Sequence, residues 1–339
     1  MKSLTALSSP PRTWPLFGRG SAVARGEWYV REEAIMGTAI RAELWSEDRL
    51  QARAALDAVM CEMHRIDRAM SPHKPHSELS IINRHAATRP VALSEEMTRL
   101  VARAIDFSRL SGGAFHITYA AVGQLYDYRE RVAPDDDAVV RARAAVGWQH
   151  LILDERNRSL RFDREGVRID LGGFAKGHAV DNAAAILARR GIAHAMVSAG
   201  GDSRVIGDRR GRPWTVAIRD PRRPGEVVAL LPLEDVSIST SGDYERCFVA
   251  ADGVRHHHLI DPRTGRSPAG VRSVTILAPD GLTSEGLSKC LFVLGLREGM
   301  QLIESQPGVD AVVVDGAGTL HRSSGLLDGG TAAPTATCQ

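Results

Sequence analysis

Short apolar segments with the period of β-strands gather into runs along the second half of the chain, and this arrangement limits the fold more than any other feature. Helical patterns return between these runs. Such a distribution is typical of an α+β protein, and it predicts largely antiparallel sheets with packed helices. An early strand is expected where Ile40, Ala42 and Leu44 alternate with polar residues, and the other expected strands cover residues 151–153, 159–162, 167–171, 195–198, 214–218, 227–231, 236–239 and 273–277.

Amphipathic helices are expected at several places. The first follows Ser46 as its N-cap, and its apolar stripe consists of Leu56, Val59, Met63, Ile66 and Met70. A second begins after the N-cap Ser94 and stops at the glycine pair 112–113. The remaining helices start at the acidic segment 135–137 or cover 175–190, 284–294 and 297–305.

The composition excludes several classes of protein. The 43 Lys and Arg residues nearly balance the 41 Asp and Glu residues, so the formal charge is only +2 and nucleic acid is not expected as a partner. The four cysteines are too few and too scattered for a disulfide framework. No run reaches the roughly 18 apolar residues of a transmembrane helix.

Both ends of the sequence have the composition of tails. Residues 1–27 are rich in Pro, Ser, Gly and Arg, and residues 327–339 consist largely of Gly, Ala, Thr and Pro. We expect a disordered N-terminal tail, one compact domain over 28–326 and a flexible C-terminal tail. Prolines at positions 10, 11 and 15 interrupt the apolar stretch that a signal peptide requires, so we recognise no export signal.

The segment with the most residues that could bind a ligand or take part in a reaction is 170–177, DLGGFAKG, where an expected strand meets a helix. Its glycines allow the backbone to approach a ligand closely, and the helix N-terminus offers free N–H groups to an anion. Lys176 adds a positive charge, and Asp170 can accept a hydrogen bond from a ligand. The spacing alone is equally compatible with a plain strand-to-helix turn, because glycine-rich turns are common.

Three further segments carry glycines, charges or histidines: 198–202 (SAGGD), 239–246 (STSGDYER) and 256–265 (HHHLIDPRTG). On a strand, His256 and His258 share one face, which is compatible with a metal ion. No further spaced ligand follows them. A single histidine that lies next to a carboxylate and accepts a proton is at least as good an interpretation.

Taken in order, these segments resemble the ApbE family of FAD:protein FMN transferases, from about residue 34 to residue 326. Each motif is weak alone, but their common order makes the resemblance specific. It implies a T-fold-like α+β architecture in one compact unit. The matching segments also include 35–38 (IMGT), 70–72 (MSP), 77–80 (SELS), 111–115 (SGGAF) and 291–295 (LFVLG).

The resemblance implies an enzyme that binds FAD, cleaves its pyrophosphate and attaches FMN through a phosphoester to a Ser or Thr of a target flavoprotein, with release of AMP. By position, His258 corresponds to the base that activates the attacking hydroxyl. Mg²⁺ is the implied metal, at the carbonyl of Gly173 and at positions 285 and 289. The implied cofactor-binding residues are Met36, His73, Asp170, Lys176, Ile260 and Ser288.

Four positions depart from the family pattern. Relatives direct a carboxylate and, four residues later, a Thr hydroxyl at Mg²⁺, where this chain has Glu285 and Lys289. Glu285 can still bind magnesium, but a protonated Lys289 has no lone pair and repels a dication. Without the family, an i,i+4 ion pair on an exposed helix face is the preferred interpretation, worth about 0.3–0.5 kcal/mol. His73 replaces a Tyr and His116 an Asp near the expected flavin, which predicts weaker or altered flavin binding.

Two rival functions stay open. One is an FAD pyrophosphatase, which releases FMN and AMP to water. The other is a non-catalytic FAD-binding assembly factor for a respiratory complex, which Glu285 and Lys289 favour. Covalent flavin on a target separates the transferase from both rivals, and AMP release without a target separates the rivals. Relatives usually work on the outer face of the bacterial cytoplasmic membrane, but the N-terminal sequence does not decide the compartment.

Overall fold

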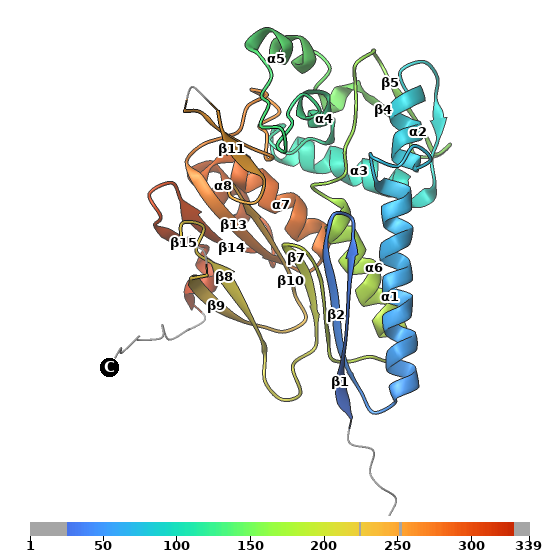
Figure 1. The fold of residues 1–339 in the computed structure, drawn as a ribbon, viewed down its shortest axis with the longest axis vertical. Helices are drawn as coiled ribbons and strands as arrows, with labels where there is room; N and C mark the ends of the chain where they lie inside the picture. The colour runs from blue at the N-terminus through green and yellow to red at the C-terminus, as the bar shows by residue number, and fades with distance from the viewer. Residues whose placement is uncertain (1–25, 224, 251–252, 329–339) are drawn as a thin grey trace, which may run out of the picture.

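The computed structural model describes residues 26–223, 225–250 and 253–328, and it is built around one eight-stranded sheet (Figure 1). Every neighbouring pair in this sheet is antiparallel, which confirms the predicted sheet type. In spatial order the strands are β1 (Glu27–Ile35), β2 (Thr38–Ser46), β6 (Ala195–Ala199), β7 (Asp202–Ile206), β10 (Ser237–Gly242), β13 (Val271–Ala278), β14 (Asp310–Asp315) and β15 (Leu320–Arg322).

A layer of helices covers the sheet, and its order follows the order of the strands (Figure 1). Alternate residues of a strand face opposite sides, so Ile276 of β13 lies in the main core under the helices, while Leu277 lies in a smaller core on the other side. The hairpin of β8 (Trp214–Arg219) and β9 (Val227–Leu233) covers that smaller core. The covering helices are α1 (Arg49–Met70), α6 (Ala175–Arg189), α7 (Gly281–Leu294) and α8 (Leu296–Glu304).

The remaining elements gather at one end of the sheet, at the top of Figure 1. A small antiparallel sheet there has the strand order β3-β5-β4. The elements are α2 (Glu78–His85), β3 (Val91–Ala92), α3 (Glu95–Leu110), η1 (Ile117–Tyr119), α4 (Ala120–Gly123), α5 (Asp136–Arg143), η2 (Trp148–His150), β4 (Leu151–Asp154) and β5 (Ser159–Phe162). The β11 (Cys247–Val249)–β12 (Arg255–His257) hairpin lies next to them, where Phe248 contacts Tyr128. The last helix, α9 (Ser324–Asp328), lies against β14.

Helix caps confirm one prediction and correct another. Ser94 caps α3 as predicted, and its hydroxyl accepts a hydrogen bond from the Met97 N–H at 3.1 Å. The first long helix, however, is capped by Asp48 and not by Ser46. The Asp48 carboxylate accepts from two N–H groups of the first turn, whereas the Ser46 hydroxyl accepts from the N–H of Asp48 itself. Ser46 therefore ends β2 and orients the cap without being the cap.

The predicted strand over 167–171 is wrong. The segment has no strand partner, because a side chain takes the place of a neighbouring strand. The side-chain amide of Asn83 donates to the Ile169 carbonyl and accepts from the Ile169 N–H, both at 2.8 Å. This pairing carries the chain, in extended form, into the glycine turn that follows Asp170.

The expected tails, 1–27 and 327–339, lie almost entirely outside the described residues; at their inner ends β1 begins at Glu27 and α9 reaches Asp328. Among the helices that the structure describes, none combines the length and apolar character needed to cross a membrane.

Candidate active site

Two glycines bring the N-terminal turns of α6 and α7 together. A Cβ on Gly177 would lie 2.2 Å from the Gly281 carbonyl oxygen, a distance that no side chain tolerates. The carboxylate of Asp181, one turn along α6, accepts hydrogen bonds from the N–H groups of Gly281 and Leu282 at 2.7 and 3.0 Å. Because the two helices start against each other, Lys176 on α6 meets Glu285 on α7.

Lys176 is held between two buried carboxylates. Its ammonium lies 2.6 Å from Asp202 Oδ2, at the start of β7, and also pairs with Glu285 Oε1. Burial lowers the pKa of the Lys176 ammonium, but the two carboxylates outweigh burial and raise it above its ordinary value. The Gly177 N–H donates to Glu285 Oε2 at 2.7 Å, and the Ser239 hydroxyl donates to Asp202.

Lys289 joins the same cluster one turn farther along α7. Its Nζ lies 3.4 Å from Glu285 Oε1, and its Cε would stand 3.6 Å from a Cβ on Gly173. Only 16% of its side chain is exposed, and that of Glu285 is fully buried. The i,i+4 ion pair therefore forms, but the expectation that it lies on an exposed helix face is wrong, because α7 packs against β10 and β13 at this point.

The residues at the family's metal position do not form a magnesium site. Mg²⁺ requires about six oxygen ligands in near-octahedral geometry. Here both oxygens of Glu285 already accept from Lys176, Lys289 and the Gly177 N–H, and the Lys289 stem lies over Gly173. A positive charge thus occupies the place where the resemblance implies a cation.

His258 lies at the edge of this cluster, directly after β12. Its N–H donates to the carbonyl of Arg246 at 3.1 Å, and its Nδ1 has no partner among the described residues. Burial lowers its pKa to about 3, with Lys289, His257 and Arg246 adding to the shift. The imidazole is therefore neutral at pH 7 and keeps a free lone pair. In the part of the chain that the structure describes, no hydrogen bond or ion pair joins the His258 ring to a carboxylate, so the expected direct contact with a carboxylate is not found.

The neighbouring histidines have separate surroundings. His256 packs against Tyr126 and Phe248, with ring centroids 5.8 and 5.2 Å away. His257 shares a hydrogen bond of 3.0 Å with the Pro268 carbonyl. Within the described ranges no three His, Cys, Asp or Glu side chains gather as a metal site, so the alternative of a metal at His256 and His258 is not supported.

Met36 stands at the tip of the β1–β2 hairpin. Met36 and Gly37 both have positive φ, 55° and 71°, as a two-residue type I′ turn requires. That conformation is unfavourable for a residue with a side chain, and such strain is common at binding sites. The tip borders a hollow of about 530 Å³, whose lining includes Thr38, His64, Asp67 and Lys74. We call it the Met36 hollow.

The other residues expected at the site differ in position. Asp170 accepts from the Gly172 N–H at 2.5 Å and from the Tyr119 hydroxyl at 3.4 Å. His73 is exposed and adjoins Lys74, a lining residue of the Met36 hollow. Ser288 is buried behind Asp202 and Glu285, where its hydroxyl pairs with Ser241 at 2.8 Å.

Two expected positions are buried in other groups of residues. Ile260 packs in an apolar group with Val122 and Tyr126. His116 is buried, and its Nδ1 pairs with the Thr118 hydroxyl at 2.8 Å. Of the expected residues, the structure thus brings Lys176, Glu285 and Lys289 into one cluster, with Gly173 against Lys289 and His258 at the edge.

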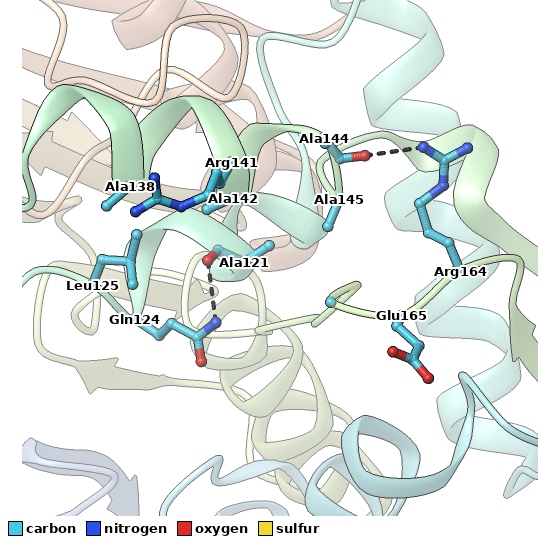
Figure 2. Close-up of a pocket in the computed structure, with 11 residues that line it drawn as sticks. Ala121, Gln124, Leu125, Ala138, Arg141, Ala142, Ala144, Ala145, Arg164 and Glu165 are labelled. Carbon is cyan, nitrogen blue, oxygen red and sulfur yellow. Dashed lines mark hydrogen bonds between the residues drawn. The ribbon is translucent and has the colours of Figure 1, made fainter.

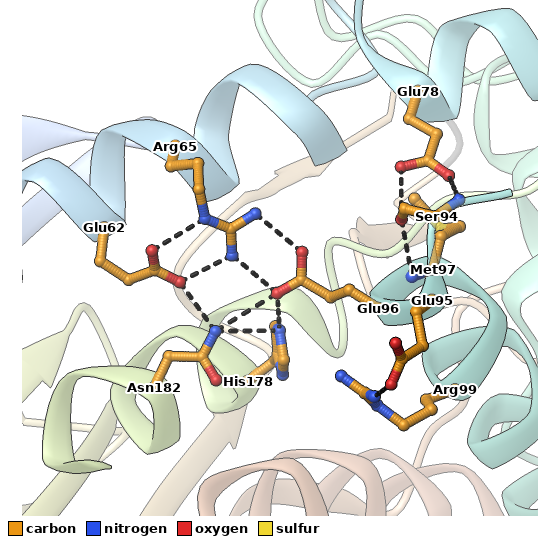
Figure 3. A network of polar contacts seen from close by, with 10 residues as sticks. All are labelled: Glu62, Arg65, Glu78, Ser94, Glu95, Glu96, Met97, Arg99, His178 and Asn182. Carbon is orange, nitrogen blue, oxygen red and sulfur yellow. Dashed lines mark hydrogen bonds and ion pairs between the residues drawn. The ribbon is translucent and has the colours of Figure 1, made fainter. Parts of the chain in front are cut away.

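A polar network that was not predicted from the sequence links α6 to α1 and α3 (Figure 3). Arg65 on α1 donates to Glu62 and Glu96, each at 2.7 Å. His178 pairs with Glu96 at 2.6 Å, and Asn182 donates to Glu62 at 2.8 Å. Two spacings in the sequence could have indicated this network: Glu62 and Arg65 are three residues apart on one helix, and His178 and Asn182 are four residues apart on another. The network joins α1, α3 and α6, and so positions the turn that carries Lys176.

A second hollow, of about 440 Å³, lies between α4, α5 and the turn around Glu165 (Figure 2). Alanine methyl groups form much of its lining, with Arg141 and Arg164 at its sides. None of the expected site residues lines it.

Comparisons with known proteins identify the family of the chain. A sequence model of the ApbE family matches residues 36–313. The chain is 31% identical to an FAD:protein FMN transferase of Treponema pallidum over 90% of this chain and 89% of that protein. It is 36% identical to one of Vibrio cholerae, over 72% and 74% of the two chains.

The solved structures show the same fold. The crystal structure of an ApbE protein from Thermotoga maritima superposes with a TM-score of 0.82 at 33% identity, and covers 89% of this chain and 98% of that one. The chain belongs to the ApbE family. The resemblance found in the sequence and the predicted α+β class are both confirmed.

Proposed function

We propose that the protein is an FAD:protein FMN transferase. The observation that carries the proposal is a neutral His258 beside a buried cluster of two ammonium groups and two carboxylates. Phosphoryl transfer depends mainly on positioning the reacting groups and neutralising charge, and it needs a group that takes the proton of the attacking hydroxyl. The relatives named for this activity match this chain over 72% to 90% of its length, and a solved flavin transferase of Vibrio cholerae has the same fold.

In the proposed reaction, the hydroxyl oxygen of a Ser or Thr on the target attacks the phosphorus of the FMN half of FAD. The bond from that phosphorus to the oxygen bridging to AMP breaks, and AMP leaves. The hydroxyl proton passes to the free lone pair of His258. Met36 contacts the flavin, while Asp170 and Lys176 hold the nucleotide. A bound pyrophosphate brings negative charge close to His258, which raises the basicity of the imidazole when it is needed.

The dependence on Mg²⁺ that the resemblance implies is not part of this proposal. The ammonium of Lys289 supports a reaction that depends little on a divalent cation, because it supplies positive charge at the position in question. An ammonium cannot polarise a phosphate as a Lewis acid does, so transfer is expected to be slow. Proposed partners are FAD and a target flavoprotein with an acceptor Ser or Thr.

The test is incubation of the purified chain with FAD and a flavin-acceptor domain, followed by in-gel flavin fluorescence after denaturation. The proposal predicts a fluorescent acceptor band, and no such band with His258→Ala or with an acceptor that lacks its hydroxyl. AMP and FMN released without a labelled acceptor would establish the pyrophosphatase instead. FAD binding with neither product would establish the non-catalytic binding protein.

A further inference from the structure

Arg246 lies directly opposite His258. The β11–β12 ladder ends at the pair Cys247 and His257, and one residue beyond it in the same register the His258 N–H donates to the Arg246 carbonyl at 3.1 Å. Side chains of directly opposed residues project from the same face of a ladder. Arg246 therefore extends over the same side as the proposed base.

The guanidinium also reaches the hairpin that carries Met36. Its Nη2 lies 3.9 Å from the position that a Cβ would take on Gly37. Arg246 thus spans the distance from the histidine to the Met36 turn. A ligand that contacts both Met36 and His258 passes beside this guanidinium.

The charge of Arg246 is not balanced within the described part of the chain. Its neighbours Arg255 and Arg272 both pair with Asp243, at 3.6 and 2.8 Å, whereas Arg246 has no carboxylate within ion-pair distance in the ranges described. Its side chain is exposed. A free guanidinium offers two parallel N–H donors, which match the oxygens of a phosphate.

The Lys176 cluster cannot supply net positive charge. Lys176 and Lys289 carry two positive charges, and Asp202 and Glu285 carry two negative ones, so the four groups together are neutral. A pyrophosphate can accept hydrogen bonds from an ammonium of this cluster, but the cluster adds no net positive charge to balance the two negative charges of the pyrophosphate. The guanidinium of Arg246 is close enough to His258 to help lower its pKa, and it has no ion-pair partner in the described ranges.

We propose that Arg246 binds the pyrophosphate of FAD beside His258 and supplies the net positive charge that the Lys176 cluster lacks. The inference rests on the proposed function, since it takes FAD as the ligand. It assigns a role to the segment 239–246, whose charged end the proposed mechanism does not otherwise use.

The test compares the binding of FAD and riboflavin, which lacks phosphate, by flavin fluorescence. Arg246→Gln should weaken FAD binding by about 10- to 100-fold, the loss of one charge-assisted contact, and leave riboflavin binding unchanged. The FAD affinity of Arg246→Lys should lie between those of the unchanged protein and Arg246→Gln, because lysine keeps the charge but not the planar pair of donors. Arg161→Gln, a change at an exposed arginine of β5, is the control and should match the unchanged protein.

Equal weakening of FAD and riboflavin would overturn the inference, because it would indicate a loss of flavin packing and not of phosphate contact. Unchanged FAD binding in Arg246→Gln would overturn it as well. The two proposals fail separately: FAD binding that depends on Arg246, without any labelled acceptor, contradicts only the transferase. Labelled acceptor with no effect of Arg246→Gln on FAD binding contradicts only the role of Arg246.

Discussion

Gly177 of α6 and Gly281 of α7 lie in direct backbone contact. A Cβ on Gly177 would lie 2.2 Å from the Gly281 carbonyl oxygen, and a Cβ on Gly281 would lie 2.5 Å from the Gly177 carbonyl oxygen. This contact sets how closely Lys176 and Glu285 approach, because each lies within one turn of its glycine. The ion pair at the centre of the site thus depends on the absence of two side chains.

Gly177→Ala should destabilise the protein by at least about 1 to 3 kcal/mol, the usual cost of overpacking, since the added methyl meets backbone and not a flexible side chain. It should also weaken FAD binding by separating Lys176 from Glu285. Denaturant unfolding and calorimetry measure the two effects. Gly316→Ala is the control, because a Cβ there meets its nearest atom at 3.5 Å, which is ordinary contact. Equal stability of both variants would contradict the account.

Lys176→Gln should destabilise the fold as well as the site. It leaves two buried carboxylates side by side, and we expect a loss of about 3 kcal/mol, near the lower end for a broken buried pair because 24% of the Lys176 side chain is exposed. Arg99→Gln removes a pair whose two members are both exposed and should cost less than about 1 kcal/mol. Urea unfolding of the two variants decides the point, and a loss in Lys176→Gln no greater than that in Arg99→Gln would show that the cluster does not hold the fold together.

Lys289 should make the reaction nearly independent of magnesium. A chelator should leave most of the transfer rate of the unchanged protein. The double change Glu285→Asp with Lys289→Thr should create Mg²⁺ activation and Mn²⁺ binding, because it removes an ammonium and adds a neutral oxygen ligand. Transfer rates over a Mg²⁺ titration and the Mn²⁺ electron paramagnetic resonance signal test this. If the unchanged protein already shows chelator-sensitive activity and Mn²⁺ binding equal to those of the double variant, Lys289 does not replace the metal.

His116 should make stability depend on pH. Burial, with a smaller contribution from His150, lowers its pKa to about 4 in the folded state, against 6.5 for the ordinary side chain. As the pH falls from 6.5 to 4, the unfolded chain takes up a proton that the folded chain does not, so the free energy of unfolding falls, by at most about 3 kcal/mol. His116→Gln should flatten this dependence, while His76→Gln, at an exposed position, should not. Parallel curves for all three proteins would contradict the assignment.

Local signals predicted local features well. The Ser94 cap, the acidic start of α5 and the spacing of Glu285 and Lys289 all follow from a few adjacent residues, and all are found. The Ser46 cap failed by two residues, because Asp48 offers a carboxylate where Ser46 offers a hydroxyl already used by the Asp48 N–H.

Features that depend on distant segments were not predicted. The extended segment before Asp170 pairs with Asn83, 86 residues away, so its apolar pattern imitated a strand. The edge strand β1 was missed because three apolar residues, 28–30, are followed by three charged ones, 31–33, so the alternation typical of a strand is absent. The burial of Lys289 depends on Gly173 and on the packing of α7 over β10 and β13, and no pattern within 284–290 reports that. The position of Arg246 opposite His258 was not predicted, because it depends on the register of β11 with β12.

The central claim is tested most directly by the ratio of AMP released to FMN attached in one reaction of the full chain with FAD and an acceptor domain. Intact-mass spectrometry of the acceptor counts attached FMN, and chromatography counts AMP. The account predicts one AMP for each FMN attached, and neither product with His258→Ala. AMP in the absence of any mass increase on the acceptor, or an attached FMN yield that His258→Ala leaves unchanged, would contradict it.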